Sequence, residues 1–114
     1  MRKILAGLAS VAFLLAMVVA APAAEATPPK DCLPGCYLAQ ATVNTWQNTQ
    51  PTGSSTRVQL VPGGDYYAIR CYVSGQSVNG DAIWYWGRYN GLWGYVAGYY
   101  LATGHDPRSG TPHC

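Results

Sequence analysis

Few side chains in this 114-residue chain are suited to acid–base or nucleophilic chemistry. The two histidines, His105 and His113, lie near the C-terminal end, and no glycine-framed serine accompanies them; Asp106 adjoins His105 without a third partner. Catalysis by such groups needs a nucleophile with a base, or paired carboxylates, held by a scaffold. Asp65 and Asp81 stand in turn sequences, where Asp commonly hydrogen-bonds its own backbone. We therefore predict neither an active site nor a cofactor.

The four cysteines, Cys32, Cys36, Cys71 and Cys114, predict two disulfides, because an even number in a small exported chain is typical of a disulfide framework. A metal site formed by Cys114 and His113 is the alternative, and oxidation outside the cell disfavours it. Three disulfide connectivities are possible. We favour Cys36–Cys71 with Cys32–Cys114, since adjacent chain ends would meet in a barrel and long loops gain most from closure.

Alternating residue patterns predict five short strands, at 37–46, 57–61, 66–73, 82–89 and 93–96. Asn90-Gly91 is a strong hairpin signal, so the last two strands should pair antiparallel about a two-residue turn. The break between the third and fourth strands begins at Ser74-Gly75, and the polar segment 47–56 is expected to be a long loop. No amphipathic helical pattern follows the N-terminal segment. Short strands separated by regular turn signals predict a small all-β barrel.

Aromatic residues gather in the second half of the predicted barrel. Of the four Trp and nine Tyr, all except Tyr37 and Trp46 lie between residues 66 and 100. Period-2 alternation places two sets of side chains on the inner face: Ile83, Tyr85 and Gly87, and across the hairpin Leu92, Gly94 and Val96. The outer face then carries Trp84, Trp86 and Arg88 opposite Trp93 and Tyr95.

The outer aromatic face has two interpretations. Small β domains use cross-strand aromatic pairs for stability, so the rings could simply cover a thin barrel. A core of this size cannot hide so many large rings, however, and an exposed contiguous aromatic surface usually marks an interaction site. Trp, Tyr and Arg are also the residue types enriched in binding hot spots.

Residues 1–26 are predicted to be a secretory signal peptide. Arg2 and Lys3 precede an apolar run over 4–20, and small residues then allow cleavage after Ala23 or Ala26. An uncleaved membrane anchor is the alternative, but no basic stop-transfer cluster follows the run. Residues 27–36 form a lead-in with a Cys-Leu-Pro-Gly-Cys turn. The remaining five basic and four acidic side chains leave no electrostatic footprint for nucleic acid or anionic lipid.

Four segments resemble a known family. The first two are Ala-Thr-Val-Asn-Thr-Trp at 41–46 and Leu-Val-Pro-Gly-Gly-Asp at 60–65. The third is Gly-Gln-Ser-Val-Asn-Gly at 75–80, followed by Ile-Trp-Tyr at 83–85, and the fourth is Gly-Leu-Trp-Gly-Tyr-Val at 91–96, ending in Tyr100-Leu101. Together they resemble the bacterial SH3 (SH3b) domain of exported actinobacterial proteins. The resemblance covers residues 37–101. The chain departs from the family pattern at 46–51, where Trp-Gln-Asn-Thr-Gln-Pro follows the first strand.

The resemblance implies an SH3-like barrel of about five antiparallel strands over 37–102, followed by an irregular tail over 103–114. It implies a binding module, not an enzyme, whose family usually recognises cell-wall peptidoglycan or its peptides in a groove beside the Trp-Tyr strand and the closing Tyr-Leu pair. The predicted ligand-binding residues are Trp84, Trp86, Arg88, Trp93, Tyr95 and Tyr100. If these residues prove dispensable, the site would move to the 46–55 loop.

Two other classes of function use the same aromatic face. One is a small secreted effector, such as an enzyme inhibitor or antimicrobial protein, that docks another protein. The other is a structural wall component that self-associates. In each case we expect an extracellular protein, free or associated with the cell wall, with no nucleic-acid partner and no stable membrane association after cleavage.

Overall fold

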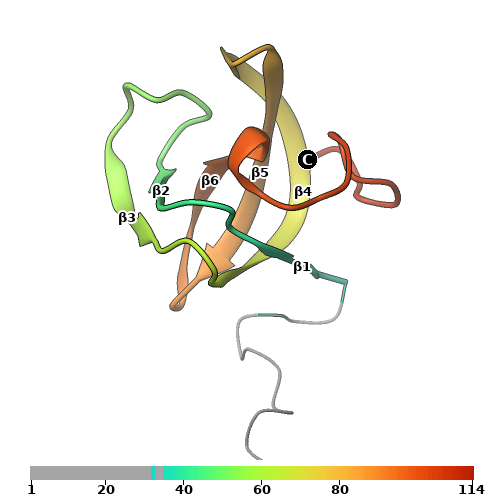
Figure 1. Cartoon of the computed structure of the whole chain (residues 1–114), viewed down its shortest axis with the longest axis horizontal. Coiled ribbons are helices and arrows are strands. Elements are labelled where there is room, and N and C mark those ends of the chain that lie inside the picture. Colours follow the sequence, from blue (N-terminus) through green and yellow to red (C-terminus); the bar gives the residue numbers. More distant parts are fainter. Residues whose placement is uncertain (1–31, 33–34) are drawn as a thin grey trace, which may run out of the picture.

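The computed structural model describes Cys32 and residues 35–114, so the predicted signal peptide over 1–26 lies outside the described residues. The described part is almost entirely β-structure (Figure 1). The strands are β1 (Tyr37–Gln40), β2 (Thr45–Asn48), β3 (Arg57–Val61), β4 (Tyr66–Val78), β5 (Asp81–Tyr89) and β6 (Leu92–Ala97), followed by the 3-10 turn η2 (Gly98–Tyr100). Within these residues no helix is long and apolar enough to cross a membrane.

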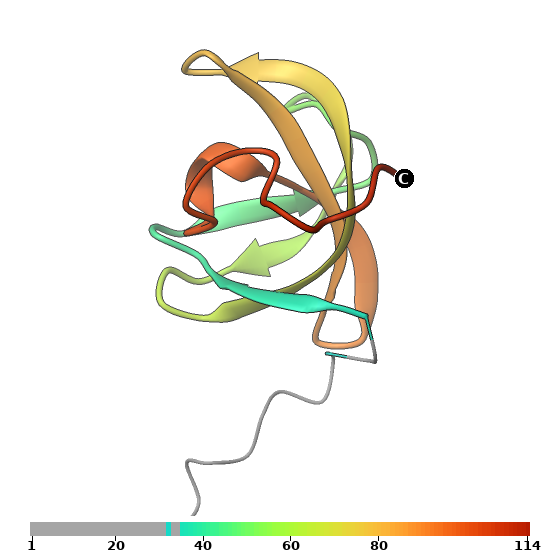
Figure 2. The same cartoon turned by 90° about the vertical axis from the view of Figure 1, so that its right-hand side faces the viewer.

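The six strands form one antiparallel sheet in the order β1-β4-β5-β6-β2-β3. Long, strongly bent strands β4 and β5 curl the sheet into a half-barrel (Figure 2). A bridge between Ala41 and Leu101 closes the open side, and the Thr42 N–H donates to the Tyr100 carbonyl at 2.9 Å. The predicted small all-β barrel is therefore confirmed, with six strands in place of about five.

The first predicted strand is in fact two. The chain leaves β1 and turns before β2, because Gly63 packs against the backbone of Val43 and donates its N–H to the Asn44 side chain at 2.8 Å. The loop predicted from residue 47 also starts later, since β2 continues to Asn48. Residues 57–61 form β3 as predicted.

Strand β4 runs through Ser74-Gly75, where a break was predicted. The chain reverses only at Asn79-Gly80, and both residues have positive φ. Asn90 and Gly91 also have positive φ, at 48° and 79°, as a two-residue hairpin turn of the predicted type requires. The resulting β5–β6 register pairs Trp86 with Tyr95, which is the cross-strand pairing that the sequence predicts.

The core combines small aliphatic residues with two fully buried tyrosines. Its members are Ala39, Ala41, Val61, Tyr67, Ile69, Tyr85, Val96 and Leu101. The Tyr67 hydroxyl donates to the carbonyl of Gly94 at 2.6 Å, so its burial leaves no unpaired donor. Tyr85 and Val96 face inward as predicted, but Leu92 is 48% exposed, because it lies at the hairpin tip beyond the reach of the core.

The C-terminal tail has no helix or strand, yet it is bound to the barrel along its length. Figure 2 shows it passing beside β4. His113 forms a parallel bridge with Tyr72, and the two rings meet edge to face at 4.9 Å. Hydrogen bonds from Tyr72 N–H to Pro112 and from Cys114 N–H to Tyr72 fix this contact, at 3.0 and 2.9 Å. The guanidinium of Arg108 lies over the ring of Tyr37.

Both predicted disulfides form, but the favoured connectivity is wrong. The pairs are Cys32–Cys36 and Cys71–Cys114. The returning tail brings Cys114 directly beside Cys71, with 4.9 Å between their Cα atoms. Cys71 is therefore already bonded, and Cys36, directly before β1, pairs with Cys32.

The two bridges should contribute unequally to stability. Cys71–Cys114 closes 43 residues and Cys32–Cys36 only four, so loop-closure entropy predicts about 4 kcal/mol for the first and about 2 kcal/mol for the second. Replacing both cysteines of each pair with alanine and measuring urea unfolding should reveal this difference. An equal loss from the two double variants would contradict it.

Candidate ligand-binding site

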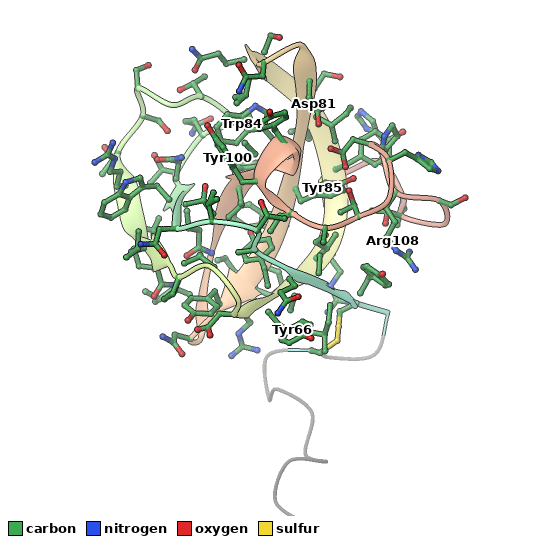
Figure 3. The ribbon with its side chains drawn as sticks, viewed as in Figure 1. Tyr66, Asp81, Trp84, Tyr85, Tyr100 and Arg108 are labelled. Atoms are coloured by element: carbon green, nitrogen blue, oxygen red, sulfur yellow. A yellow bond between two sulfur atoms is a disulfide. The ribbon has the colours of Figure 1, made fainter. Side chains whose placement is uncertain are left out.

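A cleft of about 190 Å³ opens where the β2–β3 hairpin approaches the end of the β4–β5 hairpin. Trp84 and Tyr100 lie close together at this end of the barrel, whereas Tyr66 lies at the other end (Figure 3). The lining residues, called the cleft residues below, are Thr45, Trp46, Asn48, Gly53, Arg57, Gln76, Val78, Trp84, Ala97 and Tyr100.

Trp84 forms a fixed wall of the cleft. Its Nε1–H donates to the Gln76 carbonyl at 2.8 Å, and its side chain is only 2% exposed. The sequence pattern places Trp84 on the outer face of β5 but wrongly expects it to be exposed. The loop over 49–56 covers this face, and a side chain at Gly75 would collide with both Pro51 and the Trp84 ring.

The covering loop is tied to β4 by hydrogen bonds. Gly53 N–H donates to Gln76 Oε1 at 2.6 Å, and the Gln76 N–H donates to the Pro51 carbonyl at 3.0 Å. Within the loop, Ser55 Oγ donates to the Thr52 carbonyl at 2.9 Å. Because both sides of the cleft are joined in this way, its shape exists before any ligand binds.

The opposite rim presents an aromatic ring, a cation and a buried amide. Trp46 is 39% exposed, and the Arg57 guanidinium stacks over its ring at 4.4 Å from the centroid. Asn48 is 4% exposed, and its Oδ1 is buried without a hydrogen-bond partner among the described residues. Arg57 is the one charged side chain among the cleft residues.

The structure divides the predicted ligand-binding residues into two groups. Trp84 and Tyr100 belong to the cleft. The others form an outer aromatic cluster on β5 and β6, composed of Trp86, Arg88, Trp93 and Tyr95. In this cluster the Trp86 ring stacks on Trp93 at 5.7 Å and contacts Tyr95 at 4.8 Å. Tyr95 also pairs with Asn48 across β6 and β2, so the cluster adjoins the cleft on one face of the sheet.

Sequence reasoning did not select Trp46, Asn48 or Arg57 as ligand-binding residues, although its alternative site over 46–55 includes Trp46 and Asn48. All three flank the polar loop over 49–56, which carries no aliphatic side chain and resembled a plain connection. One signal was present. Trp46 is the single tryptophan outside the aromatic-rich stretch, and it stands next to this loop.

A half-buried acidic cluster supports the wall that carries Tyr100. Asp106 Oδ1 accepts hydrogen bonds from the Tyr85 hydroxyl at 2.5 Å and from Thr103 Oγ1 at 2.6 Å. The Asp106 carboxylate also packs so closely on Gly98, at the start of η2, that a side chain there would collide with it. The tail therefore supports η2 from behind and fixes the position of Tyr100.

Asp81 and Asp106 share a proton within this cluster. Burial, together with the hydrogen bond to Asp106, raises the pKa of Asp81 from 3.8 to about 6. Burial acts against ionisation of Asp106 as well, but hydrogen bonds from Asp81, Thr103 and Tyr85 outweigh it and lower the Asp106 pKa. Below about pH 6 the favoured state therefore has Asp81 protonated and Asp106 ionised.

Comparison with known proteins identifies no family for this chain, since no protein-family model matches it and a search of curated proteins finds no significant relative. The cleft and the outer aromatic cluster are therefore the observations from which a function must be inferred. Among the described residues no group of three or more metal-ligating side chains is present.

Trp84 and Trp86 should respond differently to truncation. Trp84→Ala removes a buried ring and its hydrogen bond to Gln76, which should cost about 3–5 kcal/mol. Trp86→Ala removes a half-buried ring that packs mainly on Trp93 and Tyr95, so about 1–2 kcal/mol is expected. Chemical denaturation measures both. A smaller loss for Trp84→Ala than for Trp86→Ala would contradict the burial described above.

Asp81→Asn should raise stability at neutral pH. The raised pKa means that Asp81 stabilises the fold fully below about pH 4, and that this contribution is lost as the pH rises through about 6. Asparagine keeps the acceptor for the Ile83 N–H and offers Asp106 an uncharged donor. Because solvent screens the pair, we expect less than about 1 kcal/mol, or a few degrees in Tm, at pH 7.5 and little change at pH 5. A lower Tm at pH 7.5 would refute the shared proton, and Asp65→Asn serves as the surface control.

Proposed function

We propose that this protein is a secreted, non-catalytic binding module that recognises cell-wall peptidoglycan, or its peptides, in the cleft. The observation that supports this proposal most directly is the preformed cleft itself. Trp46 and Tyr100 give it apolar walls, and Arg57 supplies a polar anchor at the rim. Ligand sites typically combine apolar and aromatic walls with a few polar groups that fix orientation.

Binding fits the chemistry of the cleft better than catalysis does. Its side chains are aromatic rings, two small aliphatic groups, two amides, the hydroxyls of Thr45 and Tyr100, and one guanidinium, and no His, Cys, Asp or Glu lines it. Such groups hold and orient a ligand, whereas acid–base catalysis needs a titratable group within hydrogen-bond reach of the reacting atom. Asp81 and Asp106 are engaged behind η2 and do not line the cleft.

The resemblance to SH3b domains supports a cell-wall ligand. Segment 83–85, which contributes to that resemblance, contains the cleft residue Trp84. The two disulfides agree with an oxidising compartment outside the cytoplasm. The predicted signal peptide would deliver the protein there.

A protein-binding effector is the second candidate function. The observation that favours it is the outer aromatic cluster, where Trp93 is 37% exposed and stacks on Trp86 beside Arg88. Exposed Trp and Arg side chains are common at the centres of protein interfaces. The two functions place the ligand on different tryptophans and can be separated by mutation.

Trp46→Ala and Trp93→Ala form a matched pair, because each removes a tryptophan ring of similar exposure. If peptidoglycan binds in the cleft, Trp46→Ala should weaken retention on purified sacculi at least about tenfold, since truncating a central aromatic anchor costs about 2 kcal/mol or more. Trp93→Ala should bind like the unmodified protein. Chitin and cellulose serve as control matrices.

The opposite result would refute the cleft as the peptidoglycan-binding site. Loss of retention in Trp93→Ala with normal retention of Trp46→Ala would move the ligand to the outer aromatic cluster. Thermal unfolding of both variants must remain near that of the unmodified protein, as expected for partly exposed rings. Absence of retention for the unmodified protein would refute a peptidoglycan ligand.

A further inference from the structure

We propose that the cleft recognises the free carboxyl end of a peptidoglycan stem peptide, with Arg57 binding the terminal carboxylate and Asn48 accepting the last amide N–H. This inference rests on the proposed function, because it names the part of the wall polymer that enters the cleft. Four features of the cleft support it: its charge, its unpaired acceptor, its size and its aromatic walls.

The charge of the cleft selects an anion. Arg57 is its one charged residue, and no Asp or Glu lines it. Stacking on Trp46 uses the face of the guanidinium plane and leaves the N–H edges available. Among the described residues no carboxylate forms an ion pair with Arg57. A planar guanidinium with open edges is the geometry that binds a carboxylate through two parallel hydrogen bonds.

Asn48 requires a hydrogen-bond donor from the ligand. Its side chain is almost completely buried, and its Oδ1 has no partner among the described residues. A buried acceptor without a hydrogen bond is costly, and such groups in native structures call for an explanation. Because this oxygen is itself closed to solvent, the Asn48 side chain must turn toward the cleft, which it lines, for a ligand N–H to satisfy it. The Arg57 guanidinium matches the carboxylate of a single terminal residue, and the Asn48 amide oxygen matches the amide N–H of the same residue.

The size of the cleft favours a chain end over a longer ligand. A cavity of about 150 Å³ holds a molecule such as benzene. At about 190 Å³, this cleft accommodates one small terminal residue, and the rest of a longer ligand would extend outside it. Trp46 and Tyr100, which are partly exposed, offer apolar surface to the methyl group of a terminal alanine.

Matched peptides test the carboxylate directly. N-acetyl-D-Ala-D-Ala as the free acid and as the C-terminal amide differ only in charge and in one donor. Isothermal titration of the purified protein should give binding of the acid that is at least about tenfold tighter than that of the amide, since a charge-assisted hydrogen bond is lost. Equal affinity for acid and amide would overturn the inference.

Arg57→Gln should remove the preference for the acid, so that acid and amide bind with equal affinity. Arg108→Gln is the matched control, because Arg108 also stacks on a ring, that of Tyr37, and lies outside the cleft residues. This control removes the same charge and the same kind of contact. Loss of acid binding in Arg108→Gln equal to that in Arg57→Gln would show a nonspecific charge effect and overturn the assignment to Arg57.

The source of the carboxylate is tested with N-acetyl-L-Ala-L-Ala. Binding of the D-peptide acid at least as tight as that of the L-peptide acid supports a cell-wall ligand, whereas a clear preference for the L-peptide would assign the cleft to protein C termini and overturn it. Retention on sacculi without binding of either peptide would reject the carboxylate inference alone. Absence of binding to both sacculi and peptides would reject the proposed function as well.

Discussion

The buried amide of Gln47 joins the β2–β3 hairpin to the rest of the sheet. β2 pairs with β6 at one position, so backbone pairing alone holds this junction weakly. Gln47 is fully buried, donates to the Leu92 carbonyl at 3.0 Å and accepts from Gln59 Nε2 at 2.7 Å. Leaving such an amide unpaired would cost about 1–3 kcal/mol. Gly94 makes the arrangement possible, because a side chain at that position would collide with Gln47.

The geometry of the cleft depends on this junction. Trp46 and Arg57 belong to the β2–β3 hairpin, whereas Trp84 belongs to β5 and Tyr100 to η2. The distance between these walls is therefore fixed by the polar contacts of Gln47 and by the bonds between Gln76 and the loop over 49–56. Neither set belongs to the apolar core. The barrel thus uses buried polar groups to position its candidate binding surface, and aliphatic and tyrosine packing to hold the remaining strands.

Local patterns predicted the parts of the fold that depend on local interactions. Asn90-Gly91 defined the β5–β6 register, and period-2 alternation identified Tyr85 and Val96 as core residues. The disulfide pairing and the burial of Trp84 could not be predicted from local sequence patterns. Both depend on segments that return from a distance, the tail beside β4 and the 49–56 loop over β5. For the same reason the sequence indicated Trp84 and Tyr100 as site residues, included Asn48 only in the alternative site over 46–55, and missed Arg57 across the cleft.

Under a pulling force, the Cys71–Cys114 bridge also makes the two walls of the cleft respond differently. A force that pulls the chain from outside the bridged segment cannot extend residues 71–114, because the load passes through the disulfide. Trp84 and Tyr100 lie inside this inextensible loop, whereas Trp46 and Arg57 lie outside it. Tension would therefore act on β1, β2 and β3, which precede the bridged segment, and would separate the two walls of the cleft before the loop itself opens. A ligand held between them would be released at a lower load than the one needed to unravel the whole barrel.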